Sequence, residues 1–299
     1  MAIEYIKSPF NYVGGKYKLL NQLCPLFPTS IGTFVDVFSG GFNVGVNINS
    51  KRIIYNDQIT PLVNLMKHFY KNNSETIINY IKDTIHTYQL SKTDKNSFNK
   101  FRDYYNTKSK CILDLYILIC YSFNYQIRFN NQHEYNSSHG TNRSSFTKTM
   151  ENNLLKFINQ LHNLNIEFYN LDFRKLPYYN LEVNDFVYFD PPYYVSTASY
   201  NDGNRGFKNW TQKEETDLYR LCDQLSDDNI KWGLSNTLSN NGNKNIILQE
   251  WIETHNYKIY YINSDYSNSN YQKNRNNKNI EIYITNHKPH KKIIQKQLI

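Results

Sequence analysis

The sequence contains little that would indicate a cross-linked or metal-bound fold. It has four cysteines among 299 residues, and these cysteines form no C-x-x-C pair. Its eight histidines form no H-E-x-x-H pattern. Disulfide frameworks and structural zinc sites need cysteines or histidines at such close spacings. We therefore expect no metal and no disulfide bonds, and a reducing cytoplasm is the natural compartment.

Long apolar runs and an apolar leader are also missing. No stretch of the chain is long and apolar enough to cross a bilayer, and the first residues lack the apolar core of a signal peptide. We expect a soluble intracellular protein that has no membrane partner.

Negative charge is in the minority. Lys and Arg number 34 against 26 Asp and Glu, which gives a formal net charge of +8. A moderate positive excess favours a polyanionic partner. The richness in Asn, Lys, Ile and Tyr could also reflect an AT-rich genome, so the charge supports this partner only in part.

Several apolar segments predict strands that end in a polar turn and are followed by a helix. One of these segments starts near Gly32, and the others cover residues 52–55, 186–189 and 230–236. A helix is expected after the glycines at 40 and 41, another after Asp57, and a third over 211–225. Strand, short turn and helix in succession indicate a parallel α/β sheet with ligand sites at the carboxyl ends of its strands. A late hairpin is expected from residues 257–267 and 279–286.

The middle of the chain has a different pattern. Residues 62–164 are mostly helical in character, with helices expected over 96–106 and 111–129. A polar stretch over 130–146 interrupts them. We interpret this region as a helical insertion that carries one irregular loop, within an α/β domain formed by residues 1–61 and 165–299.

The segment DFVYFDPPYY, residues 185–194, is the most informative part of the sequence. Pro191 and Pro192 donate no hydrogen bond, so they end the apolar strand and stiffen the chain. The Asp190 carboxylate and the Pro191 carbonyl would then project as paired acceptors beside the Tyr193 ring. This set suits a planar group that bears an NH2, such as a nucleobase turned out of its helix.

The same arrangement suits a chemical step at an adenine amine. That amine is a poor nucleophile, and positive charge grows on its nitrogen as it attacks an electrophilic methyl group. Fixed acceptors aimed at its hydrogens would stabilise this charge. A plain proline turn is the alternative, but it does not account for an acid and a tyrosine around the prolines.

Three motifs, NYVGGK, VFSGG and DPPYY, stand in the order in which they occur in a known family. In them the chain resembles the Dam-like, D12-type DNA adenine methyltransferases, and the resemblance extends from residue 8 to residue 286. It implies a Rossmann-like fold that binds S-adenosylmethionine, formed by residues 1–61 and 165–299. It also implies that residues 62–164 recognise the target in double-stranded DNA.

The resemblance implies a set of cofactor-binding residues. Departures from the family pattern are Tyr12, where tryptophan is usual, and Phe42, where a last glycine is common. A glycine turn before a helix and a helix cap at Asp57 are the alternative interpretations. The implied cofactor-binding residues are Tyr12, Gly14, Gly15, Lys16, Asp36, Phe38, Gly40, Gly41, Asp57, Asp172, Phe173 and Asp190.

The polar stretch resembles the family's target-reading loop. Arginine can read guanine and asparagine can read adenine by paired hydrogen bonds, and a solvated loop is the alternative. The stretch lacks the family's proline and the glycine before the aromatic residue, so GATC is one candidate target. The implied DNA-binding residues are Arg128, Asn130, Tyr135, Asn136 and Arg143.

The leading hypothesis is a DNA adenine methyltransferase in which Asp190, Pro191, Pro192 and Tyr193 form the catalytic pocket. A DNA-binding regulator without activity, or an enzyme acting on single-stranded DNA or RNA, are the alternatives. Related enzymes that modify cytosine generally carry Ser at the Asp190 position, and those that modify RNA or glutamine carry Asn. A separately acting restriction endonuclease is a possible partner, and the family suggests a monomer.

Overall fold

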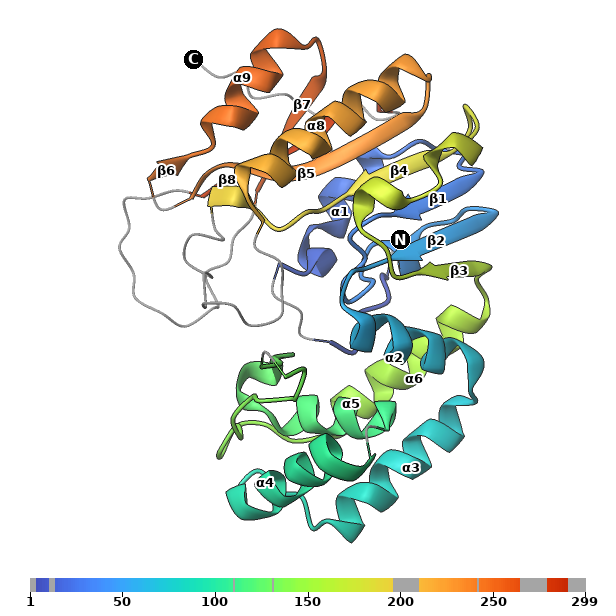
Figure 1. Ribbon diagram of the computed structural model, residues 1–299. Coiled ribbons are helices and arrows are strands. Elements are labelled where there is room, and N and C mark those ends of the chain that lie inside the picture. Colours follow the sequence, from blue (N-terminus) through green and yellow to red (C-terminus); the bar gives the residue numbers. More distant parts are fainter. Residues whose placement is uncertain are drawn as a thin grey trace.

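The computed structural model of the chain describes residues 4–10, 14–109, 111–130, 132–195, 210–240, 242–263 and 279–289. Its centre is a sheet in the order β3-β2-β1-β4-β5-β8-β7, with β6 paired to β5 (Figure 1). The strands are β1 (Thr33–Asp36), β2 (Arg52–Asn56), β3 (Ile166–Tyr169), β4 (Phe186–Phe189), β5 (Lys231–Asn240), β6 (Asn243–Lys244), β7 (Lys258–Ile262) and β8 (Ile280–Thr285).

The strand directions define a mostly parallel sheet in which β8 and the two-residue β6 run in the opposite direction. β1 pairs in parallel with β2 and β4, β2 with β3, and β4 with β5. β8 is antiparallel to both β5 and β7. The strand order turns back between β1 and β4, and a ligand crevice is expected outside the carboxyl ends of the strands at such a point. The predicted Rossmann-like α/β fold is confirmed.

Alternate residues of the strands enter two different hydrophobic cores. Phe34 and Tyr188 belong to one buried cluster, whereas Val35 and Val187 belong to the other. Successive side chains of a strand point to opposite faces of the sheet. The unbroken apolar run of β4 therefore reflects a central strand covered on both faces.

Helices cover both faces of the sheet. α8 (Gln212–Asp227) and α9 (Ile246–Thr254) pack on the Val35 side, and a capping box at Thr211 starts α8. On the other face lie η1 (Lys16–Leu19), α1 (Leu20–Leu23), η2 (Cys24–Leu26) and α2 (Thr60–Lys71). Short 3-10 turns, η6 (Phe173–Lys175) and η7 (Tyr178–Asn180), follow β3.

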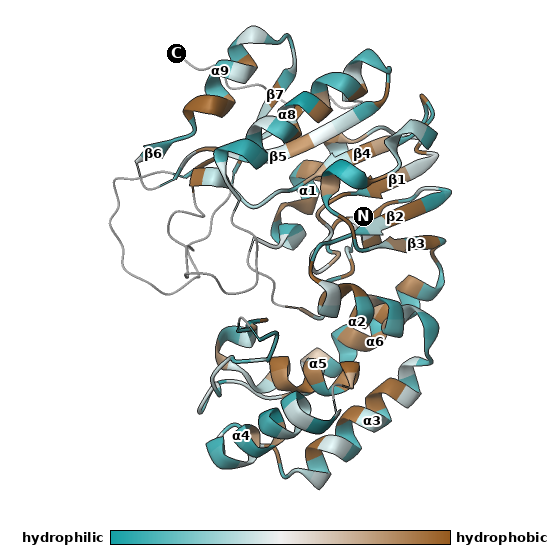
Figure 2. Ribbon diagram, viewed as in Figure 1, coloured by the Kyte–Doolittle hydropathy of each residue, from teal (hydrophilic) through white to brown (hydrophobic). Residues whose placement is uncertain are grey.

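The remaining helices form the predicted helical part. They are α3 (Ser74–Thr87), α4 (Lys95–Tyr104), the π-turn η4 (Tyr105–Ser109), α5 (Ile112–Tyr121), η5 (Phe123–Tyr125) and α6 (Lys148–His162). α5 is buried from Leu113 onward, and in Figure 2 it is largely hydrophobic, as are the inner strands. In Figure 1, α2 and α6 lie between the sheet and the helices α3, α4 and α5. One buried cluster includes residues of both the sheet and these helices.

Two expected helices differ from the structure. The segment after the glycine pair forms only the 3-10 turn η3 (Gly45–Asn47), because its chain is held close to Asp36 and Phe42. The helix expected over 111–129 ends at Tyr121, where Ser122 becomes extended and pairs with His139. The four-residue β3 was not predicted, since only tertiary pairing with β2 marks so short a segment as a strand.

Candidate active site

Asp190 follows directly on the central strand β4. All four residues of β4 are buried, and Tyr188 is in register with Asp36 at the end of β1. Asp190 therefore lies at the carboxyl edge of the sheet, at the place where the strand order turns back. The Asp190 side chain is 18% exposed, so a ligand can reach it. Pro191 is buried and Pro192 is exposed.

Lys16 reaches Asp190 from the amino-terminal turn. Its Nζ lies 2.8 Å from Asp190 Oδ1 and donates a hydrogen bond to the Gly14 carbonyl oxygen at 3.0 Å. Burial raises the pKa of Asp190, and the Lys16 ammonium opposes that rise. Gly14 adopts a φ of 79°, which favours glycine at this turn, and Gly15 precedes η1. The structure thus joins two predicted motifs that are far apart in the sequence.

Tyr193 and Glu281 complete this cluster. The Tyr193 hydroxyl donates to Glu281 Oε1 at 2.8 Å and to Asp190 Oδ1 at 3.3 Å. The Lys16 ammonium lies 5.0 Å from the centre of the Tyr193 ring and 3.5 Å from Glu281 Oε1. Glu281, on β8, did not emerge from the sequence motifs. The only local signal was an acid within an apolar strand.

The glycine loop after β1 is held by carboxylates from two strands. Gly40 N–H donates to Asp57 Oδ2 at 2.9 Å, and Gly45 N–H donates to Asp36 Oδ2 at 3.2 Å. Gly40 has a φ of 48°, and Phe42 has a φ of 64° although it is not glycine. The Phe42 ring is fully buried and packs edge-on against Tyr55. Burial of this ring accounts for its place in a left-handed position.

Both carboxylates of the glycine loop are buried. Burial raises the pKa of Asp57 to about 6, although hydrogen bonds from the backbone amides of Ile59 and Gly40 act in the opposite direction. Burial also raises the pKa of Asp36 well above its usual range, and the nearby Asp190 adds to the effect. Each carboxylate can accept further hydrogen bonds, because its two oxygens offer about four lone-pair positions.

Asn56 connects the loops that follow three strands. Its side-chain amide donates to the carbonyls of Val37 at 2.9 Å and Leu171 at 3.1 Å, and its oxygen accepts from Leu171 N–H at 2.9 Å. Asn56 is 1% exposed. Sequence reasoning placed Asn56 only at a strand end, because its partners become visible only when β1, β2 and β3 are paired.

Asp172 and Phe173 lie beside the same edge. Arg174 forms hydrogen bonds with Asp172 that lower the pKa of Asp172 to about 2, and Gln58 Nε2 donates to Asp172 Oδ2 at 3.0 Å. The Phe173 ring is 1% exposed and packs against Phe38 and Trp210, with ring centres 5.6 Å away in each case. Trp210 is therefore an additional aromatic residue at this edge.

The predicted DNA-reading residues lie on the segment between α5 and α6, which we call the hairpin because two antiparallel bridges fold it back on itself. Phe129 and Tyr135 form a bridge, and Asn136 N–H donates to the Arg128 carbonyl at 3.0 Å. Arg128, Asn136 and Arg143 are exposed. Tyr135 is 1% exposed, and its hydroxyl donates to the Gln126 carbonyl at 2.9 Å.

Asn130 shapes the tip of this hairpin. Its side-chain oxygen accepts from the backbone amides of Gln132 at 3.0 Å and Glu134 at 2.9 Å. Its side-chain amide donates to the Glu134 carboxylate at 2.8 Å. Tyr12, a predicted cofactor contact, lies outside the described residues.

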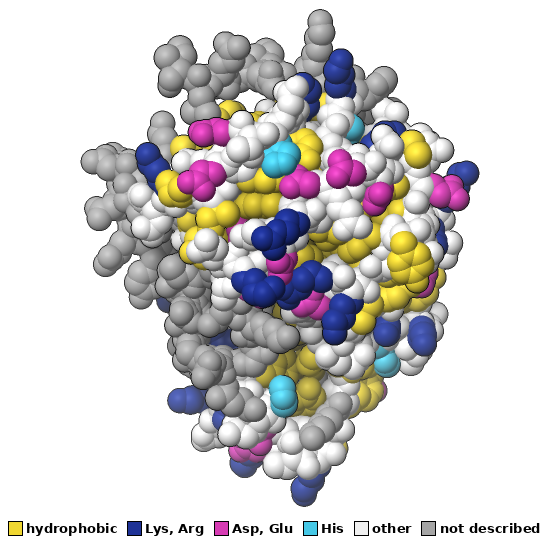
Figure 3. Space-filling view, turned by 45° about the horizontal axis from the view of Figure 1, so that its top comes forward, with side chains coloured by type: hydrophobic (Ala, Val, Ile, Leu, Met, Phe, Trp, Pro, Cys, Tyr) yellow, Lys and Arg dark blue, Asp and Glu magenta, His cyan; other side chains and the backbone are white. Residues whose placement is uncertain are grey.

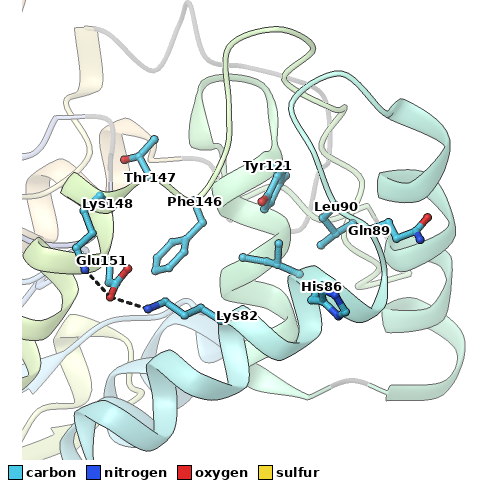
Figure 4. A pocket seen from close by; sticks show the side chains of 10 residues that line it. Lys82, His86, Gln89, Leu90, Tyr121, Phe146, Thr147, Lys148 and Glu151 are labelled. Carbon is cyan, nitrogen blue, oxygen red and sulfur yellow. Dashed lines mark hydrogen bonds and ion pairs between the residues drawn. The ribbon is translucent and has the colours of Figure 1, made fainter.

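A cavity of about 640 Å³ lies in the helical part, away from the strand-end cluster. Figure 4 shows Tyr121, Phe146 and Leu90 on its walls, at the base of the hairpin. Lys82 and Lys148 both pair with Glu151 Oε1, at 2.8 Å and 2.9 Å. Because one carboxylate holds both ammonium groups, this cavity is not a strongly charged site.

On the face shown in Figure 3, several basic side chains gather near the centre, with acidic side chains beside and above them. On α8, Asp217 pairs with Lys213 and Arg220, and it also pairs with Arg174 of η6. Within the described part of the chain, no group of three His, Cys, Asp or Glu could hold a metal ion. Among the described residues, no helix is long and apolar enough to span a membrane.

The Rossmann-like fold and the cluster of Lys16, Asp190, Tyr193 and Glu281 at its strand ends are compatible with a methyltransferase. The sequence profile of the D12 class N6 adenine-specific DNA methyltransferases matches residues 12–268. The chain belongs to this family, which confirms the predicted family resemblance.

Curated relatives extend this result. The chain is 47% identical over 284 residues to "Type II methyltransferase M.FokI" of Planomicrobium okeanokoites, covering 95% of this chain and 43% of that protein. It is 43% identical over the same length to "Modification methylase StsI" of Streptococcus sanguinis, with the same coverage. Identity to "Modification methylase LlaI" of Lactococcus lactis subsp. lactis is 31%, covering 86% of this chain and 41% of that protein. The chain thus spans about two fifths of the length of these relatives.

Proposed function

We propose that this chain transfers a methyl group from S-adenosylmethionine to the exocyclic nitrogen of an adenine turned out of duplex DNA. One observation carries the proposal. Asp190 lies at the switch point of the sheet, in contact with Lys16 and beside the carboxylates and glycines that follow β1 and β2. Acceptors for the amine and groups for a nucleoside cofactor therefore share one edge.

The residues at this edge fit S-adenosylmethionine. Asp57 retains lone pairs for ribose hydroxyls, and Gly40 and Gly41 allow the backbone to approach closely. The Lys16 ammonium suits the carboxylate of the cofactor. Phe38 lies at the start of the loop that carries Gly40 and Gly41. When bound, the cofactor supplies the electrophilic methyl group.

Asp190 and Pro191 act on the amine. Their oxygens accept hydrogen bonds from the amine N–H groups. These hydrogen bonds would stabilise the positive charge that grows on nitrogen as the N–C bond forms and the C–S bond breaks. The methylated amine then loses a proton to water, so Asp190 need not be a strong base. Tyr193 presents the ring against which the extruded base stacks.

Target reading is assigned to the hairpin between α5 and α6. Arg128, Asn136 and Arg143 are exposed on it, and we propose that they contact DNA within GATC or a related short site. Tyr135 and Asn130 support the hairpin through their hydrogen bonds. The names of the relatives suggest restriction and modification, so we also propose a separate endonuclease partner. From the family resemblance alone, we propose a monomeric enzyme.

Methyl transfer from labelled S-adenosylmethionine to duplex DNA tests this function. We expect Asp190→Ala to lose nearly all transfer, and Asp83→Ala, an exposed acid on α3, to keep the parent rate. Equal labelling by Asp190→Ala and the parent would contradict the assignment. A parent that labels only single-stranded DNA or RNA would contradict the duplex substrate.

Sequencing of modified bases in DNA from a host that expresses the protein would identify the target. The duplex that carries this target is then the substrate for the remaining experiments.

A further inference from the structure

Glu281 is a buried carboxylate in the interior of the sheet. It lies on β8, paired with Thr237 of β5 and Ile262 of β7, and it is 3% exposed. A buried carboxylate destabilises a fold unless it is paired and hydrogen-bonded. Its presence within an apolar strand therefore calls for a specific role.

The partners of Glu281 are also the partners of Asp190. Glu281 Oε1 accepts from the Tyr193 hydroxyl at 2.8 Å and lies 3.5 Å from Lys16 Nζ. Asp190 Oδ1 lies 3.3 Å from the same hydroxyl and 2.8 Å from the same ammonium. Two carboxylates thus share one phenol and one ammonium group.

These contacts divide the Asp190 carboxylate into two unlike oxygens. Oδ1 forms the ion pair with Lys16 and accepts the hydrogen bond from Tyr193. Neither of these two contacts is made to Oδ2. Since a carboxylate oxygen readily accepts an N–H donor, Oδ2 is suited to the target amine, while Oδ1 fixes the orientation of the group.

We propose that Glu281 is a positioning residue for methyl transfer, holding the Tyr193 ring by its hydroxyl and drawing the Lys16 ammonium partly away from Asp190. This inference rests on the proposed function, because it concerns the same amine and the same ring. Two effects follow from one side chain. The stacking surface keeps one orientation, and Asp190 keeps more of its negative charge available to the amine.

Removing either effect has a physical consequence. Without the Glu281 acceptor, the Tyr193 hydroxyl loses its 2.8 Å hydrogen bond to Glu281. The ring can then leave the orientation needed for stacking. Without the Glu281 charge, Lys16 pairs more fully with Asp190, which weakens Asp190 as an acceptor for a positively charged amine.

The two effects can be separated by the choice of substitution. Glu281→Gln keeps an oxygen that accepts from Tyr193 but removes the charge near Lys16. Glu281→Ala removes both. Tyr193→Phe removes the hydroxyl and keeps the ring, and so tests the hydrogen bond alone.

We expect kcat to fall about tenfold in Glu281→Gln and further in Glu281→Ala, with the Kd for S-adenosylmethionine unchanged. The acid limb of kcat should move to lower pH in Glu281→Gln, because a negative neighbour of Asp190 has been removed. The groups that face Asp190 are Lys16 of η1, Asp36 of β1, Tyr188 of β4, Tyr193 and Glu281 of β8.

A second readout follows the base itself. In a target duplex with 2-aminopurine at the adenine position, an aromatic ring stacked on the extruded base quenches its fluorescence. We expect less quenching with Glu281→Ala than with the parent. In a double-mutant cycle, we expect the effects of Glu281→Ala and Tyr193→Phe on this quenching to be less than additive.

Three outcomes decide the inference. The expected set is a lower kcat, an unchanged cofactor Kd and a shifted acid limb, all measured well below the melting temperature of each variant. If kcat and the acid limb of both Glu281 variants equal those of the parent, or if kcat falls only in step with the melting temperature and cofactor binding, the inference is overturned. A parent that transfers no methyl group contradicts the proposed function instead.

Discussion

The charge of Asp190 depends on two opposing neighbours. Burial raises its pKa, and the Lys16 ammonium at 2.8 Å counteracts the rise. The proposed role needs the ionised form, because a protonated carboxyl has lost part of its capacity to accept hydrogens. The state of this single side chain therefore limits the pH range of activity.

The first prediction concerns pH. Since the pKa of Asp190 is raised, kcat should fall as pH decreases through a value above the usual carboxyl pKa of about 4. Lys16→Met removes the opposing charge, so the acid limb should move to higher pH. Lys213→Met, on the surface of α8, is the control. An acid limb that stays in place in Lys16→Met, measured at saturating cofactor, would contradict this account.

Phe42 and Gly45 form a second residue-scale pair. A methyl group at Gly45 would meet the Phe42 ring at 2.1 Å, so Gly45→Ala forces the ring out of its packing. We expect a loss of about 1–3 kcal/mol in the free energy of unfolding, which is the usual range for overpacking. Urea unfolding measures it. In a Phe42→Ala background most of this loss should vanish, and a full loss there would contradict the contact.

At the scale of elements, the hairpin between α5 and α6 separates residues that support it from residues that are exposed on it. Asn130 and Tyr135 hold the backbone through their hydrogen bonds, whereas Arg128 and Asn136 are exposed side by side. A supporting residue affects every duplex alike. A residue that reads a base changes the preference between duplexes.

The prediction at this scale is a difference in specificity. Arg128→Ala and Asn136→Ala should each weaken binding to the target duplex by about 1–3 kcal/mol and should affect non-target duplexes less. Arg220→Ala, on α8, is the control for loss of one positive charge. Binding titrations at one salt concentration measure this. A uniform loss across all duplexes would indicate phosphate contacts instead of base reading.

At the scale of the whole molecule, the catalytic and helical parts are joined by a shared core. One buried cluster includes Phe34 and Tyr188 of the sheet together with Leu115 of α5 and Phe157 of α6. Packing that continues between two parts favours a single cooperative unfolding transition. The division into residues 62–164 and the remainder therefore stays a prediction about function and not about separate stability.

Cooperative unfolding can be measured with probes in different places. All three tryptophans, Trp210, Trp232 and Trp251, belong to the buried cluster on the α8 side of the sheet. Far-UV circular dichroism also reports on the helices of the middle part. We expect tryptophan fluorescence and circular dichroism to give the same urea midpoint, and two separate midpoints would contradict one cooperative unit.

The sequence by itself determined the class of fold and predicted where the main site lies. Short-range patterns carried this information, because the apolar run before Asp190, the two prolines and the glycines after β1 act on their own neighbours along the chain. The same local signals failed for η3 and for the end of α5, where contacts with distant segments decide the conformation.

Only the tertiary structure decided which distant residues meet. Glu281 shares Lys16 and Tyr193 with Asp190 because β8 runs antiparallel between β5 and β7. Asn56 joins three loops because β1, β2 and β3 are neighbours. Neither role leaves a local pattern, since a buried acid or amide obtains its partners from other strands. Pairing across the sheet, and not the order of residues along it, assembles the cluster around Asp190.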